Sequence, residues 1–101
     1  MKPLCYHPAA LEEQREAIRH YADIDPKLGS DCRKLMLAAR SKLQNNPGLF
    51  AEDEGNGCRE YIMRRYPYSF HYLELSDHIW IVAVAHHSRK PGYWRYRLQQ
   101  S

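Results

Sequence analysis

Apolar residues in the first half of the chain recur at helical spacing and form two stripes. The first stripe comprises Ala10, Leu11, Ala17, Ile18, Tyr21 and Ala22, and the second comprises Leu28, Cys32, Leu35, Ala39 and Leu43. Proline suits the first position of a helix and keeps the residue before it out of helical space, so His7-Pro8 and Asp25-Pro26 each predict a helix start. Asn46-Pro47-Gly48 predicts the end of the second helix. The pattern indicates helices over 8–24 and 27–45, joined as an antiparallel hairpin.

The second half of the chain has the pattern of β-strands. Three runs rich in aromatic and β-branched residues, 58–65, 67–75 and 78–86, follow an acidic loop that contains glycine. Their short connections, around Tyr66-Pro67 and Ser76-Asp77, predict hairpins in an antiparallel meander. The third run is apolar at almost every position, which predicts a central strand covered on both faces.

The two ends of the chain complete the predicted fold. Residues 2–6 are expected to form an edge strand, and residues 91–101 are expected to form one or two helical turns against the sheet edge. We therefore predict one α+β domain over residues 1–101. It has an N-terminal strand, a helical hairpin packed on an antiparallel sheet of three to four strands, and a short C-terminal helical tail.

Composition limits the class of protein. A chain of 101 residues with 44% hydrophobic residues fits one folded domain. The longest uncharged apolar run, 79–85, is too short to span a bilayer, and the N-terminus does not have the pattern of a signal peptide. These features lead us to expect a cytoplasmic protein without membrane association. Three widely spaced cysteines, Cys5, Cys32 and Cys58, match neither a disulfide framework nor a metal knuckle, and are expected to be reduced and semi-buried.

The distribution of charge indicates an anionic partner. Residues 59–101 carry seven Lys/Arg against three Asp/Glu, whereas residues 1–58 carry eight against nine. Such an excess favours nucleic acid or an acidic protein segment as partner, although an ordinary solvated surface has the same composition. Glu12, Glu13 and Glu16 lie near the start of the first helix, where negative charge complements the helix dipole.

The stretch VAVAHHSRKPGYW, residues 82–94, carries the densest candidate chemistry. Neighbouring residues of a strand point to opposite faces, so His86 and His87 are not expected to share a metal ion, and no cofactor is expected. By strict alternation His86 shares a face with Trp80, Val82 and Val84. Two roles are open for this histidine: a cap that hydrogen-bonds loop backbone, or a charge switch beside an anionic ligand.

Basic and aromatic residues suggest a binding surface. Alternation places Arg59 and Arg65 on one face, and we predict that they converge with Arg89, with His86 beside them. For Arg89 the alternative is an ion pair with the acidic loop at 52–54. Tyr93 and Trp94 are expected mainly to hold the tail on the sheet.

Several motifs, in order along the chain, resemble those of the RelE/ParE toxin superfamily. They are His7-Pro8-Ala9-Ala10, Tyr21 with Asp25-Pro26 and Gly29, Asn46-Pro47, Arg59, Arg64-Arg65-Tyr66-Pro67-Tyr68, and the closing His86, Arg89, Pro91 and Tyr93-Trp94. The resemblance runs from Pro3 to about Arg97 and is closer to the ParE-like branch. It implies the toxin of a type II toxin–antitoxin, or plasmid stabilisation, system that is neutralised by a cognate antitoxin.

The superfamily contains two activities. ParE-like members bind and inhibit DNA gyrase, whereas RelE-like members cleave mRNA at the ribosome. RelE-like members carry lysines on the strand that corresponds to residues 58–65 and an arginine on the strand that corresponds to residues 67–75. In this chain Glu60-Tyr61-Ile62 and Ser69 stand at those positions. The resemblance therefore favours a non-catalytic gyrase inhibitor, with a ribosome-dependent mRNA endonuclease as the alternative. The target-binding residues it implies are Arg59, Arg65, His86, Arg89, Tyr93 and Trp94, and the alternative catalytic set is His86, Arg89 and Tyr93. Neither the oligomeric state nor the identity of the antitoxin follows from it.

Overall fold

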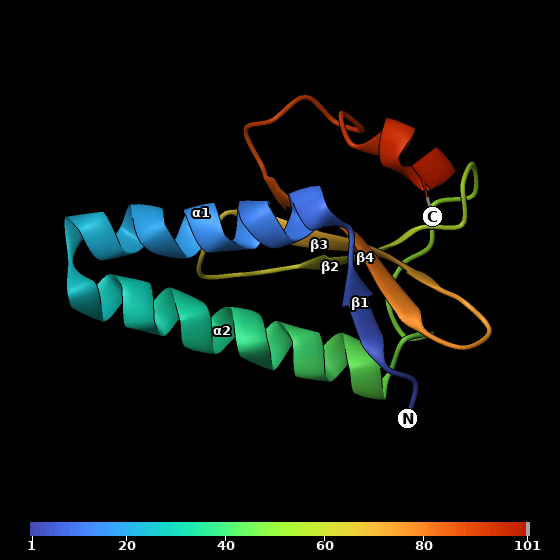
Figure 1. Ribbon diagram of the computed structural model, residues 1–101, viewed down its shortest axis with the longest axis horizontal. Helices are drawn as coiled ribbons and strands as arrows, with labels where there is room; N and C mark the ends of the chain where they lie inside the picture. The colour runs from blue at the N-terminus through green and yellow to red at the C-terminus, as the bar shows by residue number, and fades with distance from the viewer. Residues whose placement is uncertain (101) are drawn as a thin grey trace.

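The computed structural model describes residues 1–100 and has the predicted α+β order of elements (Figure 1). The elements are β1 (Leu4–Tyr6), α1 (Pro8–Ile24), α2 (Pro26–Asn45), β2 (Arg59–Ile62), β3 (Tyr68–Glu74), β4 (Ile79–His86) and the 3₁₀ helix η1 (Arg95–Gln100). Both helix boundaries agree with the prediction to within one residue. Neither α1 nor α2 nor η1 combines the length and the apolar character needed to cross a membrane.

Each long helix begins where a polar side chain caps it. The ring nitrogen Nδ1 of His7 accepts a hydrogen bond from the backbone N–H of Ala9 at 3.0 Å. The carboxylate of Asp25 accepts one from the N–H of Lys27 at 2.9 Å. Each cap precedes a proline at the first helical position, where the absent N–H costs no hydrogen bond. The two dipeptides therefore set the start of each helix and the corner between them.

The sheet is mixed, with strand order β1-β4-β3-β2. The meander β2-β3-β4 is antiparallel, as predicted, and β4 is a central strand. The N-terminal strand, however, pairs with β4 in parallel, with Leu4 beside Ile79 and Tyr6 beside Ile81. A wholly antiparallel sheet was therefore the wrong expectation. The parallel pair is possible because the helical hairpin and the first two meander strands separate β1 from β4 along the chain, which gives ample length for a crossover.

A β-bulge in β4 changes which side chains share a face. Ile81 pairs with Tyr72 and Ala83 pairs with His71, so that Val82 is the extra residue. As a result Val82 and Ala83 both lie on the face away from the helices, and strict alternation fails at that point. The expectation that His86 shares a face with Trp80 and Val82 is wrong for this reason.

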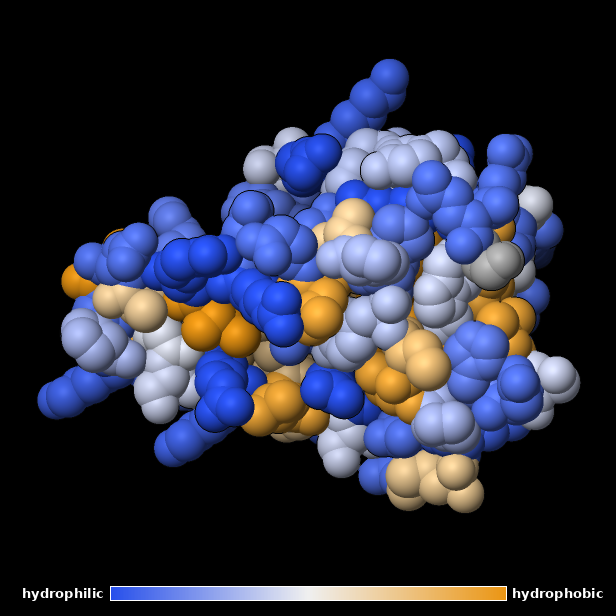
Figure 2. Space-filling view, in the orientation of Figure 1, coloured by the Kyte–Doolittle hydropathy of each residue, from blue (hydrophilic) through white to orange (hydrophobic). Residues whose placement is uncertain are grey.

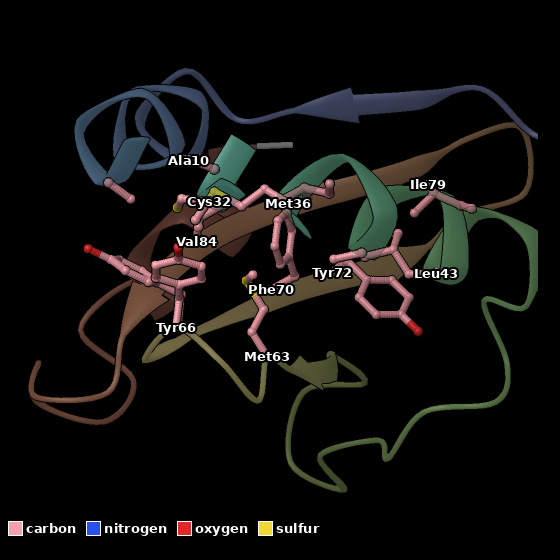
Figure 3. Packing of buried hydrophobic residues seen from close by; sticks show 14 residues of the cluster. Ala10, Cys32, Met36, Leu43, Met63, Tyr66, Phe70, Tyr72, Ile79 and Val84 are labelled. Carbon is pink, nitrogen blue, oxygen red and sulfur yellow. The ribbon is translucent and has the colours of Figure 1, made fainter. Parts of the chain in front are cut away.

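The main core lies between the helical hairpin and the sheet (Figure 3). Its largest fully buried side chains come from α2 and the meander and include Met36, Leu43, Phe70, Tyr72 and Ile79. Each large apolar side chain buried in this way stabilises the fold by about 1.5–3 kcal/mol relative to exposure. The hairpin is thereby fixed across one face of the sheet.

A smaller core covers the opposite face under the tail. Trp94 is 5% exposed and packs with Cys58, Trp80, Val82, Ala83 and Ala85. The tail, drawn in red in Figure 1, returns toward the N-terminal end of α1, where Gln100 Oε1 lies 2.6 Å from His7 Nε2. It therefore lies across a face of the sheet and not, as predicted, against its edge. Figure 2 shows a largely polar surface over the helices, interrupted by small apolar patches.

Candidate functional site

An open cleft with a volume of about 460 Å³ lies on the face of the sheet that the helices leave free. Its floor is formed by side chains of β2, β3 and β4, and its walls are the loop around Asp53 and the segment that runs into the tail. The lining includes Glu60, Ser69, His71, Ala85, His87, Arg89, Lys90, Trp94 and Arg95. Polar groups of both signs therefore meet at one concave surface.

Two histidines stand in the cleft beside hydrogen-bonding partners. His71 stacks on Trp94 with 4.4 Å between ring centroids, and its Nε2 lies 3.7 Å from the carboxylate of Glu60. Burial lowers the pKa of His71, and nearby His87 acts in the same direction, while the carboxylates of Glu60 and Glu13 oppose the shift. His87 Nε2 lies 2.9 Å from Ser69 Oγ. Within residues 1–100, no three His, Cys, Asp or Glu side chains are placed to hold a metal ion.

Arg89 and Tyr93 form the outer wall of the cleft as a stacked pair. The guanidinium carbon of Arg89 lies 3.8 Å from the centroid of the Tyr93 ring, which is a cation–π contact. The Tyr93 hydroxyl donates a hydrogen bond to Glu13. Burial together with this hydrogen bond and the charge of Glu13 raises the pKa of Tyr93 well above its usual range. The phenol is therefore a fixed hydrogen-bond donor and a poor acid or base near neutral pH.

His86 points to the other side of β4 and stacks edge-on against Tyr68, with 5.0 Å between ring centroids. Its Nδ1 accepts a hydrogen bond from the backbone N–H of Ser88 at 3.0 Å. The capping role proposed for it is thus confirmed. The residue borders both the cleft and a smaller hollow of about 300 Å³ beside α1, which Glu16 and His20 also line.

Arg59 and Arg65 do not converge with Arg89. Arg59 pairs with Glu52 at 3.0 Å and donates to the carbonyl oxygen of Phe50 at 2.7 Å. Arg65, 66% exposed in its side chain, pairs with Asp31 of α2 at 3.4 Å. Each arginine is instead paired with an acid from a different element, and neither lines the cleft that Arg89 borders. The predicted cluster of three arginines is therefore wrong, and only Arg89 and His86 of that set border the cleft.

The acidic loop at 52–54 does not form the ion pair with Arg89 that was given as the alternative role of this arginine. Glu52 binds Arg59, and Asp53 lies 3.7 Å from Arg95, whereas Arg89 stacks on an aromatic ring. Trp94 lines the cleft while its side chain is buried, so its role as a tail anchor agrees with the prediction.

Sequence reasoning missed the residues that line the floor of the cleft and the anchor of the tail. The cross-strand pair Glu60 and His71 follows from the register of β2 and β3, and period-two spacing places Ser69 on the same face. Those signals were present in the chain. No comparable signal links Glu13 to Arg97, whose guanidinium binds both of its carboxylate oxygens at 2.8 and 3.0 Å. Glu13 was expected to complement the dipole of α1, but the first turn of this helix contains no acidic residue. The carboxylate of Glu13 instead binds Arg97 of the tail.

Comparison with known proteins supports the fold. No protein-family model matches the chain, and no curated protein sequence matches it. A solved structure described as a chromosomal ParDE TA system from P. aeruginosa superposes with a TM-score of 0.73 at 19% sequence identity. The match covers 85% of this chain and 96% of that chain. At this level of identity the likeness establishes the architecture. The chain therefore shares its fold with that chain of the ParDE TA system.

Proposed function

We propose that this protein is the toxin of a type II toxin–antitoxin system, that it inhibits growth by binding DNA gyrase, and that a cognate antitoxin neutralises it. The observation that carries this proposal is the fold, which this chain shares with a chain from a ParDE TA system. The sequence motifs at the helix starts and at the end of β4 support the same assignment.

The chemistry of the cleft favours a binding role over cleavage of RNA. Phosphodiester cleavage needs cations beside the developing phosphorane charge and a mobile acid and base. Here the carboxylate of Glu60 and the neutral hydroxyl of Ser69 stand on the floor. The Tyr93 hydroxyl donates a hydrogen bond to Glu13, and His86 Nδ1 accepts one from the backbone N–H of Ser88. The alternative catalytic set of His86, Arg89 and Tyr93 is thus poorly arranged for proton transfer.

The target-binding surface that we propose is the outer wall of the cleft, Arg89 with Tyr93, bordered by His86 and Trp94. The side chain of Arg89 is exposed and stacked on a ring, so it can offer a charge-assisted hydrogen bond to an acidic group at little cost in side-chain entropy. Arg59 and Arg65 contribute positive charge elsewhere on the surface and already have acidic partners.

One observation keeps ribosome-dependent mRNA cleavage as a second candidate. His87 and His71 lie in the same cleft as Arg89 and Lys90, which is a possible acid–base and phosphate-binding set different from the one predicted. In that reaction His87 and His71, and not His86 and Tyr93, would transfer protons.

Two assays on the purified protein separate these functions. A gyrase inhibitor reduces DNA supercoiling by gyrase and leaves mRNA on programmed ribosomes intact. An endonuclease gives the opposite result, and His87→Gln then lowers the cleavage rate by about a hundredfold or more. A protein that is inactive in both assays, and harmless when expressed alone, would refute the toxin assignment.

A further inference from the structure

The carboxylate of Glu13 joins three separate parts of the molecule. Its Oε1 accepts hydrogen bonds from the backbone N–H of Val84 at 3.1 Å and from Arg97 Nη1 at 2.8 Å. Its Oε2 accepts from the Tyr93 hydroxyl at 2.5 Å and from Arg97 Nη2 at 3.0 Å. One side chain of α1 thereby holds β4, the start of the tail and its 3₁₀ helix.

These contacts are largely withdrawn from water. Arg97 is 5% exposed, and its Nη1 also donates to the carbonyl oxygen of Val82 at 3.1 Å. Charge-assisted hydrogen bonds at a site of low exposure are stronger and better defined in geometry than those at the surface. The Tyr93 hydroxyl therefore has a fixed acceptor.

Tyr93 in turn contacts Arg89. The guanidinium of Arg89 lies 3.8 Å from the centre of the Tyr93 ring. Among the salt bridges formed within residues 1–100, none involves Arg89, so its guanidinium contacts the ring without competition from a carboxylate. A chain of direct contacts thus runs from Glu13 through Tyr93 to Arg89.

We propose that Glu13 is the positioning residue of the target-binding wall: by holding the Tyr93 hydroxyl it fixes the ring on which Arg89 stacks, and so presents Arg89 in the orientation that an anionic group of the target requires. The inference rests on the proposed function for the nature of the target. Side chains that are ordered before binding lose less conformational entropy when they bind, which is why this arrangement increases affinity.

The first measurement tests the positioning itself and needs no target. The Tyr93 ring current shifts the NMR signals of the Arg89 side chain upfield. Glu13→Gln and Tyr93→Phe should both move these signals toward the values of a free arginine, because Tyr93→Phe removes the hydrogen bond that holds the ring and Glu13→Gln weakens it by removing the charge of its acceptor. Glu12→Gln, a change at an exposed neighbour paired only with Arg19, should leave them unchanged. Arg89 signals that stay in place in Tyr93→Phe would overturn the proposal.

The second measurement distinguishes positioning from a general loss of stability. Tyr72→Phe serves as a matched control, because it too removes one buried phenol hydrogen bond, to the carbonyl oxygen of Pro47 at 2.8 Å. We expect Tyr93→Phe to weaken gyrase inhibition roughly tenfold, the effect of about 1.4 kcal/mol in binding, and Tyr72→Phe to leave it unchanged at similar thermal stability. The double variant Glu13→Gln/Tyr93→Phe should be no weaker than Glu13→Gln alone. Equal losses in Tyr93→Phe and Tyr72→Phe would assign Glu13 a structural role only.

The two measurements also separate an error in the proposed target from an error in the proposed role of Glu13. Wild-type protein that does not inhibit gyrase refutes the target, while the NMR comparison still decides whether Glu13 positions Arg89.

Discussion

The imidazole of His71 stacks on the indole of Trp94, with 4.4 Å between ring centroids and 30° between ring planes. This contact joins the centre of β3 to the tail. We expect the attachment of the tail to depend on the protonation of this histidine, because His71 is largely buried and its Nε2 lies 3.7 Å from Glu60.

Stability should therefore fall with acidification. Burial lowers the pKa of His71 in the folded state below its value in the unfolded chain, which is about 6.5. Between these two pKa values the unfolded chain binds more protons, so the free energy of unfolding decreases as pH falls below about 6.5 and is at its full value above it. Urea unfolding between pH 5 and 8, followed by tryptophan fluorescence, measures this slope. His71→Gln should reduce it, and an unchanged slope would contradict the assignment.

Gly29 should not tolerate a larger residue. It lies at the start of α2 against α1, and a Cβ added there would lie 2.5 Å from the Cβ and 2.7 Å from the Cα of Ala22. Backbone and a short side chain cannot move away, so Gly29→Ala should separate the helices at the corner and cost about 1–3 kcal/mol in thermal or urea unfolding. Gly48→Ala, where nothing lies within 4 Å, is the matched control and should change stability little.

The three cysteines should differ sharply in reactivity. Cys5 is exposed, whereas Cys32 and Cys58 are buried. Burial, assisted by the nearby charges of Asp31 and Asp53, raises the pKa of each buried thiol to about 11. Because the thiolate is the reactive form, a thiol reagent at pH 7.5 should label one cysteine in the native protein and all three in urea. Rapid native labelling of Cys58 would show that the tail core opens readily.

Arg89 should matter more for growth inhibition than other exposed arginines. Charge reversal by Arg89→Glu places a carboxylate where we propose that an acidic group of the target binds, and toxicity should fall at least about tenfold. Arg64→Glu makes the same change of charge at an exposed position outside the cleft and should retain most of the activity. Circular dichroism checks that both variants are folded. Equal toxicity of the two variants would exclude Arg89 from the target-binding surface.

The elements of this fold could be predicted from local patterns. The prolines after His7 and Asp25 start the helices, and the nearly continuous apolar run of 79–85 becomes the buried central strand. The parallel direction of β1 and the place of the tail could not be predicted in this way. The direction of β1 depends on its pairing with β4, more than seventy residues away, and the place of the tail depends on its contacts with the sheet face and with Glu13. Alternation and capping carry no information on such contacts.

The candidate site was predicted in part. Arg89, Tyr93, Trp94 and His86 were identified by their concentration near the end of β4, and they border the cleft. The convergence of Arg59 and Arg65 with them was wrong, because Glu52 and Asp31 are acids from other elements that pair with these arginines first. Alternation predicts on which side of a sheet two side chains lie, but it does not predict how far apart they are along the strand.

The bulge at Val82 has a consequence for insertions and deletions in this strand. Removal of this one residue would leave the side chains on either side of it facing as they do now, because Ile81 and Ala83 already pair with consecutive residues of β3. It would, however, also remove the carbonyl oxygen that accepts a hydrogen bond from Arg97. The sheet is thus expected to tolerate a deletion that the tail does not. Among homologous proteins, we expect the extra residue at the position of Val82 and the arginine at the position of Arg97 to be present or absent together.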